Sequence, residues 1–195
     1  MRIIAGALRG RRLAAPPGEA TRPTADRVRQ ALFDMLVHAP WAGPDAIAGA
    51  RVLDAFAGTG ALGLEALSRG AATATFFETN ENSRRTLAAN IAACGVEARA
   101  RVLAADAARP PRAWPLGEAC TLVFLDPPYG EEGLPGRATA ALASGGWIAP
   151  GALIVLEAGA SAKAPFPAIP PEWASPLAER RHGAARLLFL RAKGD

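Results

Sequence analysis

Cysteine and histidine are scarce in this sequence. Its 195 residues include only two cysteines, Cys94 and Cys120, and two histidines, His38 and His182. Two cysteines are too few for a disulfide framework, and the four residues do not have the spacing of a zinc site. Each cysteine lies in or beside an apolar stretch, so we expect two buried free thiols in a reducing compartment. Neither histidine has a nucleophile or ligand set as a partner, so we expect structural roles and no metal.

Long apolar runs are missing as well. The longest uncharged apolar runs fall far below the about 20 residues that a membrane-spanning helix requires. The apolar patch between Arg2 and Arg9 is too short for a signal peptide. These absences predict a soluble, cytoplasmic protein with no membrane partner. A length of 195 residues is typical of one domain with a sizeable core, and a monomer is the default expectation.

Positive charge is concentrated at the start of the chain. Lysine is nearly absent, so the formal net charge of +4 comes mainly from arginine. Residues 1–30 contain two acids, Glu19 and Asp26, and seven arginines: Arg2, Arg9, Arg11, Arg12, Arg22, Arg27 and Arg29. This segment therefore carries a net +5 and the rest of the chain a net −1. Such a distribution favours contact with a nucleic acid over a general role in solubility.

The first 20 residues have the pattern of a hairpin. Two short apolar pieces, residues 3–5 and 13–15, flank a segment rich in glycine and arginine. The arginines of this segment are Arg9, Arg11 and Arg12. We interpret the hairpin as an arm that grips phosphates, and the alternative is a solvated basic loop.

A helix is expected after this hairpin. Thr24 is a suitable N-cap, and apolar residues follow at positions 28, 31, 32, 35 and 36. Arg22, Arg27 and Arg29 lie at the start of the helix, where cations oppose the helix dipole. A sequence that accepts this cost can use the site to hold an anion, although a few solvated arginines cost almost nothing.

From residue 51 onward, strand patterns alternate with helix patterns. This alternation predicts an α/β fold with a mostly parallel sheet and right-handed crossovers. No clear long helix separates the last two expected strands, so the final strand could be antiparallel, and the Pro/Ala-rich tract 162–176 is low in complexity. The expected strands are residues 51–56, 73–78, 99–104, 120–126, 152–157 and 185–191, and the expected helices are residues 60–69, 80–93 and 133–145.

The first strand leads into a glycine-rich turn. Gly58, Gly60 and Gly63 have the spacing of a dinucleotide-binding loop, in which glycines permit a tight turn before a helix. Asp54, however, lies in the strand four residues before the first glycine, where an anion would repel a pyrophosphate. The same carboxylate would attract a cationic ligand such as S-adenosyl-L-methionine (SAM), which has a sulfonium, an ammonium and no phosphate. The alternative is a carboxylate that only bonds the loop or caps the helix.

Acidic residues end the next three strands too. Glu78, 18 residues after Gly60, could accept hydrogen bonds from both hydroxyl groups of a ribose. Asp106 could accept from an adenine amino group, and Asp126 ends the fourth strand. Because the carboxyl ends of parallel strands face one edge of a sheet, we expect these carboxylates to gather there.

The fourth strand ends at a corner with distinctive chemistry. The apolar run 122–125 is typical of a strand buried on both faces, and Asp126, Pro127, Pro128 and Tyr129 follow it. Because proline donates no ladder hydrogen bond, the strand must end there. The Asp126 carboxylate and the Pro127 carbonyl could accept both hydrogens of an exocyclic amine on a base, and Tyr129 could stack on that base. The alternative is that the prolines merely end a buried strand.

Together these motifs resemble a known family. Residues 126–129 resemble motif IV of amino-group methyltransferases, which are class I SAM-dependent enzymes. More narrowly, nearly the whole chain resembles the bacterial 16S rRNA (guanine-N2)-methyltransferases. The matching residues are 1–6, 9–13, 22–24, 26–29, 31–33 and 54–71. One departure is His182-Gly183, where this family has a Tyr-Gly pair before the last strand.

The resemblance implies a Rossmann-like, seven-stranded sheet flanked by helices, with residues 1–20 as an RNA-contacting hairpin and residues 21–195 as the methyltransferase domain. It implies transfer of the SAM methyl group to guanine N2 in 16S rRNA, within the small subunit or an assembly intermediate. The implied cofactor-binding residues are Thr24, Asp54, Phe56, Ala57, Gly58, Thr59, Gly60, Glu78 and Asp106. The implied catalytic residues are Asp126, Pro127, Pro128 and Tyr129. The expected RNA-binding residues are Arg9, Arg11, Arg12, Arg22 and Arg27.

Three other functions remain open from the sequence. An adenine-N6 methyltransferase on DNA or RNA would share residues 126–129, because this motif does not name the base. A nicotinamide-dependent oxidoreductase would use the glycine-rich turn. A non-catalytic RNA-binding assembly factor would use only the basic N-terminus.

Overall fold

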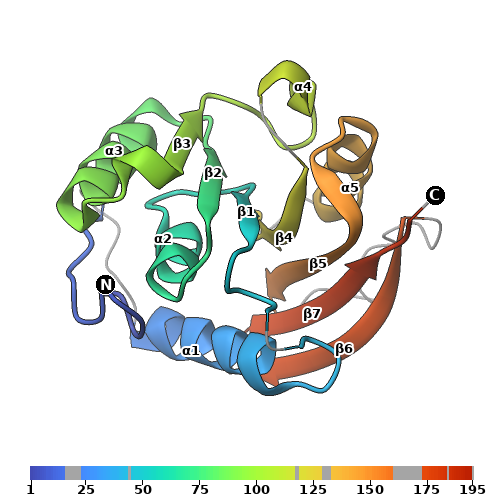
Figure 1. The fold of residues 1–195 in the computed structure, drawn as a ribbon, viewed down its shortest axis with the longest axis horizontal. Helices are drawn as coiled ribbons and strands as arrows, with labels where there is room; N and C mark the ends of the chain where they lie inside the picture. Colours follow the sequence, from blue (N-terminus) through green and yellow to red (C-terminus); the bar gives the residue numbers. More distant parts are fainter. Residues whose placement is uncertain are drawn as a thin grey trace.

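The chain folds into helices around a central sheet (Figure 1). A computed structural model describes residues 1–15, 23–43, 45–116, 119–128, 133–159, 173–183 and 185–194. The helices are α1 (Pro23–His38), α2 (Ala61–Ser68), α3 (Glu81–Cys94), η1 (Glu97–Arg99), α4 (Ala113–Leu116) and α5 (Leu134–Ser144). The strands are β1 (Arg51–Asp54), β2 (Thr73–Phe77), β3 (Ala100–Leu103), β4 (Cys120–Leu125), β5 (Ile148–Gly159), β6 (Ala174–His182) and β7 (Ala185–Ala192).

The strands form one mixed sheet in the order β3-β2-β1-β4-β5-β7-β6. β1 to β5 are parallel to one another, whereas β7 is antiparallel to β5 and β6 is antiparallel to β7. The sheet confirms the expected Rossmann-like, seven-stranded α/β fold with an antiparallel last strand. The strand order reverses between β1 and β4, and ligands of such sheets bind at this switch point.

The central strands are apolar on both faces because helices cover both sides of the sheet. Successive residues of a strand point to opposite faces. Phe124 of β4 packs in a core with residues of α1, α2 and α3, whereas Leu125 packs in a second core with residues of α5. Both side chains are buried. The expectation that the run 122–125 is buried on both faces is therefore confirmed.

The sequence pattern does not predict β6. This edge strand contains Pro176, and its exposed second half carries Glu179, Arg180 and Arg181, so it has no apolar run. Proline and charged residues are typical of edge strands, where they prevent pairing with other chains. The strand covers residues 174–176 of the tract expected to be low in complexity.

Three smaller differences concern element bounds. α1 starts at Pro23, so Thr24 lies inside the helix, and the prediction that it is the N-cap is wrong. Proline at the first helical position is favourable, because its missing N–H would have no helical partner there. β5 is longer than the expected 152–157, and the single turn of α4 was not expected.

Other sequence expectations concern cysteines, histidines and membrane spans. Cys94 and Cys120 are buried free thiols, as expected. His38 and His182 are exposed at the ends of α1 and β6. Within the described ranges, no helix is long and apolar enough to cross a membrane. No group of three or more His, Cys, Asp or Glu residues in those ranges could hold a metal ion.

Residues 1–15 form the expected hairpin, which we call the N-terminal arm. The Ile3 N–H donates to the Arg11 carbonyl over 2.9 Å, and the Leu13 N–H donates to the Met1 carbonyl over 3.1 Å. Ile3 and Leu13 are buried and belong to the core that contains α1, α2 and α3. The arm is therefore packed on the domain and does not project freely from it.

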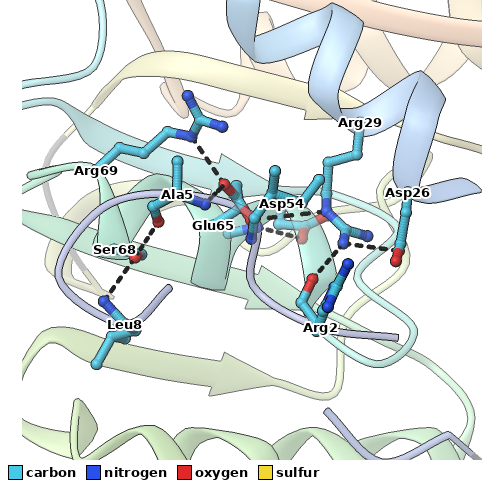
Figure 2. A network of polar contacts seen from close by, with 11 residues as sticks. Arg2, Ala5, Leu8, Asp26, Arg29, Asp54, Glu65, Ser68 and Arg69 are labelled. Carbon is cyan, nitrogen blue, oxygen red and sulfur yellow. Dashed lines mark hydrogen bonds and ion pairs between the residues drawn. The ribbon is translucent and has the colours of Figure 1, made fainter. Parts of the chain in front are cut away.

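The buried carboxylate of Glu65 on α2 holds the N-terminal arm in place (Figure 2). Its two oxygens accept hydrogen bonds from the backbone N–H groups of Ile4, over 2.7 Å, and Ala5, over 3.0 Å. At the end of the same helix, the Ser68 hydroxyl accepts from the Leu8 N–H over 3.0 Å and donates to the Ala5 carbonyl over 2.5 Å. Because α2 binds the backbone of the arm, the arginine side chains of the arm are left for other contacts.

Two arginines complete the surroundings of Glu65 (Figure 2). Arg69 donates to the Glu65 carboxylate over 2.8 Å, and its guanidinium lies 4.7 Å from the centre of the Phe33 ring. Arg29, with a side chain only 4% exposed, has its Nε 3.8 Å from the same carboxylate and donates to Asp26 over 2.9 Å. A buried charge without a partner is costly, and here each guanidinium has a carboxylate within reach. The anions that Arg29 holds at the start of α1 are therefore carboxylates of the protein itself.

We expect the Glu65→Ala variant to be strongly destabilised. It removes a carboxylate with no exposed side-chain surface and leaves two buried guanidinium groups and two backbone N–H groups short of a partner. The expected loss in the free energy of unfolding is about 3–5 kcal/mol. Chemical denaturation measures it, with Glu97→Ala on η1, at an exposed position, as the control. Equal stability of the two variants would contradict this role of Glu65.

Candidate active site

A cleft of about 1340 Å³ lies at the carboxyl ends of the parallel strands. Acids that follow or end four of these strands line it: Asp54, Glu78, Asp106 and Asp126. The structure therefore brings together the four carboxylates singled out in the sequence. It also brings Phe56, Ala57, Gly58, Thr59, Pro127 and Pro128 to the same cleft.

Some of the expected site residues lie elsewhere. Gly60 is the N-cap of α2 and is not among the cleft-lining residues. Tyr129, Arg22 and the side chain of Thr24 lie outside the described part of the structure. The remaining expected RNA-binding residues, Arg9, Arg11, Arg12 and Arg27, are exposed and do not line the cleft.

The glycine-rich loop is shaped by carboxylates. The Gly58 N–H donates to Glu78 Oε2 over 2.8 Å, and the Gly63 N–H donates to Asp54 Oδ2 over 3.0 Å. These donors are therefore already bonded to anions of the protein, unlike the free N–H groups with which a glycine loop binds phosphate. Gly63 also packs against the Phe76 ring, where an added Cβ would lie 2.3 Å from a ring carbon. The loop suits a ligand without a phosphate.

Asp54 is a buried carboxyl group near two other acids. Burial raises the pKa of Asp54 to about 7, the hydrogen bond from Gly63 lowers it in part, and Asp126 and Glu78 raise it further. Burial also raises the pKa of Asp126 to about 6. Three acids in one confined site repel one another, and a bound cation would relieve this repulsion.

The other two cofactor candidates keep free acceptor positions. Glu78 accepts from the N–H groups of Gly58 and Asn80, the latter over 2.7 Å. Asp106 is exposed and accepts from the Ala108 N–H over 2.8 Å. A carboxylate has about four acceptor positions, so both residues can also bind hydroxyl or amino groups of a ligand.

The N-terminal arm forms one wall of the cleft, through Met1 and Ala15. Asn90 on α3 connects this wall to the glycine-rich loop. Its side chain accepts from the Ala14 N–H over 2.8 Å and donates to the Ala14 carbonyl over 3.1 Å. The same amide group donates to the Thr59 carbonyl over 2.9 Å. One side chain thus fixes the arm relative to a loop that lines the cleft.

The sequence reasoning missed several residues of the cleft. Glu157 near the end of β5 and Arg137 on α5 both line it, as do Asp26 and Arg29 on α1. Glu157 carries the same signal as the other acids, because it follows an apolar run in a predicted strand. The inward position of Asp26 and Arg29 has no such signal, because it depends on the docking of α1 against Glu65.

Comparison with known proteins shows what the chain is similar to. The model of a family described as conserved hypothetical protein 95 matches residues 1–191. The chain belongs to this family.

Solved structures share the fold of this family member. The yhhF protein of Escherichia coli, described as a candidate methyltransferase, has a TM-score of 0.80 and 35% identity, covering 100% of this chain and 99% of that one. A candidate methylase of Haemophilus influenzae, HI0767, has a TM-score of 0.74 and 30% identity, covering 99% and 98%.

Named relatives of this family member are rRNA methyltransferases. Ribosomal RNA small subunit methyltransferase D of Escherichia coli (strain K12) is 39% identical over 173 residues, which cover 89% of this chain and 81% of that protein. The protein of the same name from Haemophilus influenzae is 38% identical over 162 residues, covering 80% of this chain and 78% of that protein.

The buried Asp54 predicts a pH-dependent stability for the ligand-free protein. A carboxyl group with a raised pKa in the folded state stabilises that state at low pH, and this contribution is lost as the pH rises through the folded value. For Asp54, this loss of stability occurs in the pH range between its ordinary pKa of 3.8 and its pKa in the folded protein of about 7. Asp54→Asn stays neutral and can still accept from Gly63, so it should gain stability relative to the natural protein between about pH 5 and pH 8, on the order of 2 kcal/mol.

Urea unfolding across this pH range measures the difference. The exposed Asp45→Asn variant is the control, and its stability should follow that of the natural protein at every pH. If Asp54→Asn also ran parallel to the natural protein, the Asp54 carboxyl group could not have a raised pKa.

Proposed function

We propose that this protein transfers the methyl group of SAM to the exocyclic N2 amine of a guanine in 16S rRNA. Relatives named as small-subunit rRNA methyltransferases support methylation of rRNA. The observation that carries the proposed site is the carboxylate-lined cleft beside the Asp126-Pro127 corner. The substrate is this RNA within the small ribosomal subunit or an assembly intermediate, and the enzyme acts as a monomer.

The donor set of the cleft fits SAM. Bound SAM supplies a methyl group already activated by the positive charge of its sulfonium. Asp54 provides negative charge for the cationic part, and its bond to Gly63 keeps the loop N–H from attracting a phosphate. Glu78 accepts from the ribose hydroxyl groups, and Asp106 accepts from the adenine amino group. The bonded loop amides also argue against the nicotinamide-dependent oxidoreductase.

The Asp126-Pro127 corner holds the amine that is methylated. Asp126 accepts one hydrogen of the amine, and the Pro127 carbonyl accepts the other, which directs the nitrogen lone pair towards the methyl carbon. The negative carboxylate stabilises the positive charge that develops on the nitrogen as the new bond forms. With a pKa of about 6, Asp126 is mostly ionised at neutral pH and can accept the proton that the nitrogen then releases.

Residues 1–20 serve as an RNA-contacting extension of a methyltransferase domain that spans residues 21–195. Arg9, Arg11 and Arg12 of the extension and Arg27 of α1 are exposed. In the described part of the chain, these four side chains form no ion pair with a carboxylate. They are therefore suited to phosphate contacts, which supply most of the salt-dependent affinity for a nucleic acid.

The first test of this function replaces Asp126 by Asn. Labelled SAM is incubated with small subunits that lack the modification, and the methylated nucleoside is identified by mass. The natural protein should produce N2-methylguanosine, and Asp126→Asn should lose about 100-fold or more in turnover. SAM should still raise the melting temperature of the variant, which shows a working cofactor site.

Asp45→Asn, an exposed carboxylate of the loop before β1, is the matched control and should keep full turnover. Unchanged turnover of Asp126→Asn would contradict the role of Asp126. N6-methyladenosine as the product would identify the adenine alternative, and RNA binding without any transfer would identify an assembly factor.

The second test measures the salt dependence of RNA binding. Replacing Arg9, Arg11 and Arg12 by Gln should weaken binding and reduce the slope of log K against log salt by about 0.7–0.9 for each phosphate that the variant no longer neutralises. Arg180→Gln, on β6 at the far edge of the sheet, is the control and should leave the slope unchanged. An unaltered slope in the triple variant would show that the arm does not bind phosphates.

A further inference from the structure

Glu157 lies beside the proposed catalytic corner. β4 and β5 are parallel neighbours, and their register pairs Leu125 with Leu156. The next residues are Asp126 and Glu157, so the two acids stand next to each other at the point where β4 ends and β5 continues beside β7. Adjacent strands are about 4.8 Å apart. Both acids line the same cleft, which makes Glu157 a second carboxylate close to the amine that Asp126 would hold.

The alternation along β5 places Glu157 on the same side of the sheet as the rest of the site. Leu156 belongs to the core with α5, whereas Val155 belongs to the core with α1, α2 and the N-terminal arm. Glu157, two residues after Val155, points to the side of Val155. Asp54 has the same relation to Val52, which is in the same core. Glu157 therefore lies on the face where the arm forms the wall of the cleft.

A second carboxylate beside Asp126 could distinguish guanine from the other bases that carry an exocyclic amine. In guanine, the ring nitrogen N1 next to the N2 amine carries a hydrogen and is a donor. In adenine and cytosine, the ring nitrogens next to the exocyclic amine carry lone pairs and are acceptors. A carboxylate beside the one that holds the amine would therefore attract guanine and repel the two other amino-bearing bases.

We propose that Glu157 accepts the N1–H of the target guanine and so determines which base is methylated. This inference rests on the proposed function, and it names the residue that separates guanine-N2 from adenine-N6 methylation. Glu157 also has an interaction within the protein. A carboxylate can accept about four hydrogen bonds, so an interaction within the protein leaves the Glu157 side chain able to accept from a base as well.

The experiment exchanges donor and acceptor both on the target base and on the side chain at position 157. The target guanine is mapped in the subunit and then replaced by 2-aminopurine, in subunits reconstituted with RNA ligated from synthetic pieces. 2-Aminopurine keeps the amine at position 2 but has a lone pair at N1. In Glu157→Gln, the side-chain amide can donate to that lone pair.

Glu157→Gln should reduce kcat/KM for the guanine substrate by about 5- to 10-fold, because the amide oxygen can still accept the N1–H but lacks the negative charge that makes such a bond about twice as strong. It should act on the 2-aminopurine substrate better than the natural protein does, which a misfolded variant could not. The rise in melting temperature with SAM should be the same for both proteins. Glu97→Gln, an exposed residue of η1, should behave as the natural protein on both substrates.

The outcomes separate the two claims. If the natural protein forms N2-methylguanosine and Glu157→Gln acts on guanine at the same rate, the inference about Glu157 is wrong and the proposed function stands. An equal loss on both substrates would show a structural role for Glu157 and also overturn the inference. If the natural protein forms no N2-methylguanosine, the proposed function itself fails.

Discussion

Acidic side chains that accept hydrogen bonds from backbone N–H groups determine the shape of this molecule around its cleft. Asp54 binds the first turn of α2, Glu78 binds the glycine-rich loop, and Glu65 binds the N-terminal arm. Each carboxylate supplies acceptors for backbone N–H groups that have no partner in a helix or a sheet. The loop and the arm that surround the cleft thus depend on the same interaction, repeated at three places.

These bonds have an electrostatic cost that the proposed ligand relieves. Burial and neighbouring acids raise the pKa of Asp54 to about 7, so without a ligand its ionised form is unfavourable near neutral pH. A cationic ligand reverses that balance. A phosphate-bearing ligand would add to the repulsion, and it would find the N–H groups of Gly58 and Gly63 already bonded. The preference for a cation is therefore built into the protein itself, before any contact with a substrate.

The strands and the acids that end them can largely be predicted from the sequence, because each is indicated by a short stretch of neighbouring residues. An apolar run followed by Asp54 or Asp126 marks both a strand and its functional end, and Glu157 carries the same signal although it was overlooked. β6 could not be recognised in this way, since an edge strand with Pro176 has no apolar run. The Glu65 network could not be predicted either: it joins Ile4 to a residue 61 positions later, and only the folded chain brings them together. Tyr129, Arg22 and the roles of the cofactor residues stay predictions.

Asn90 connects the N-terminal arm, which is proposed to bind RNA, to the glycine-rich loop, which is proposed to bind the cofactor. Its one amide group binds Ala14 in the arm and the Thr59 carbonyl in the glycine-rich loop. An RNA that displaced the arm would have to break the hydrogen bonds of Asn90 or move the glycine-rich loop together with the arm. In the same way, a ligand that ordered the loop would also order the arm. Two ligands connected through one such element influence each other's affinity by the same factor in both directions. The RNA and the cofactor could then bind in either order with different affinities at each step. The free energy of the complex with both ligands bound would be the same for both orders.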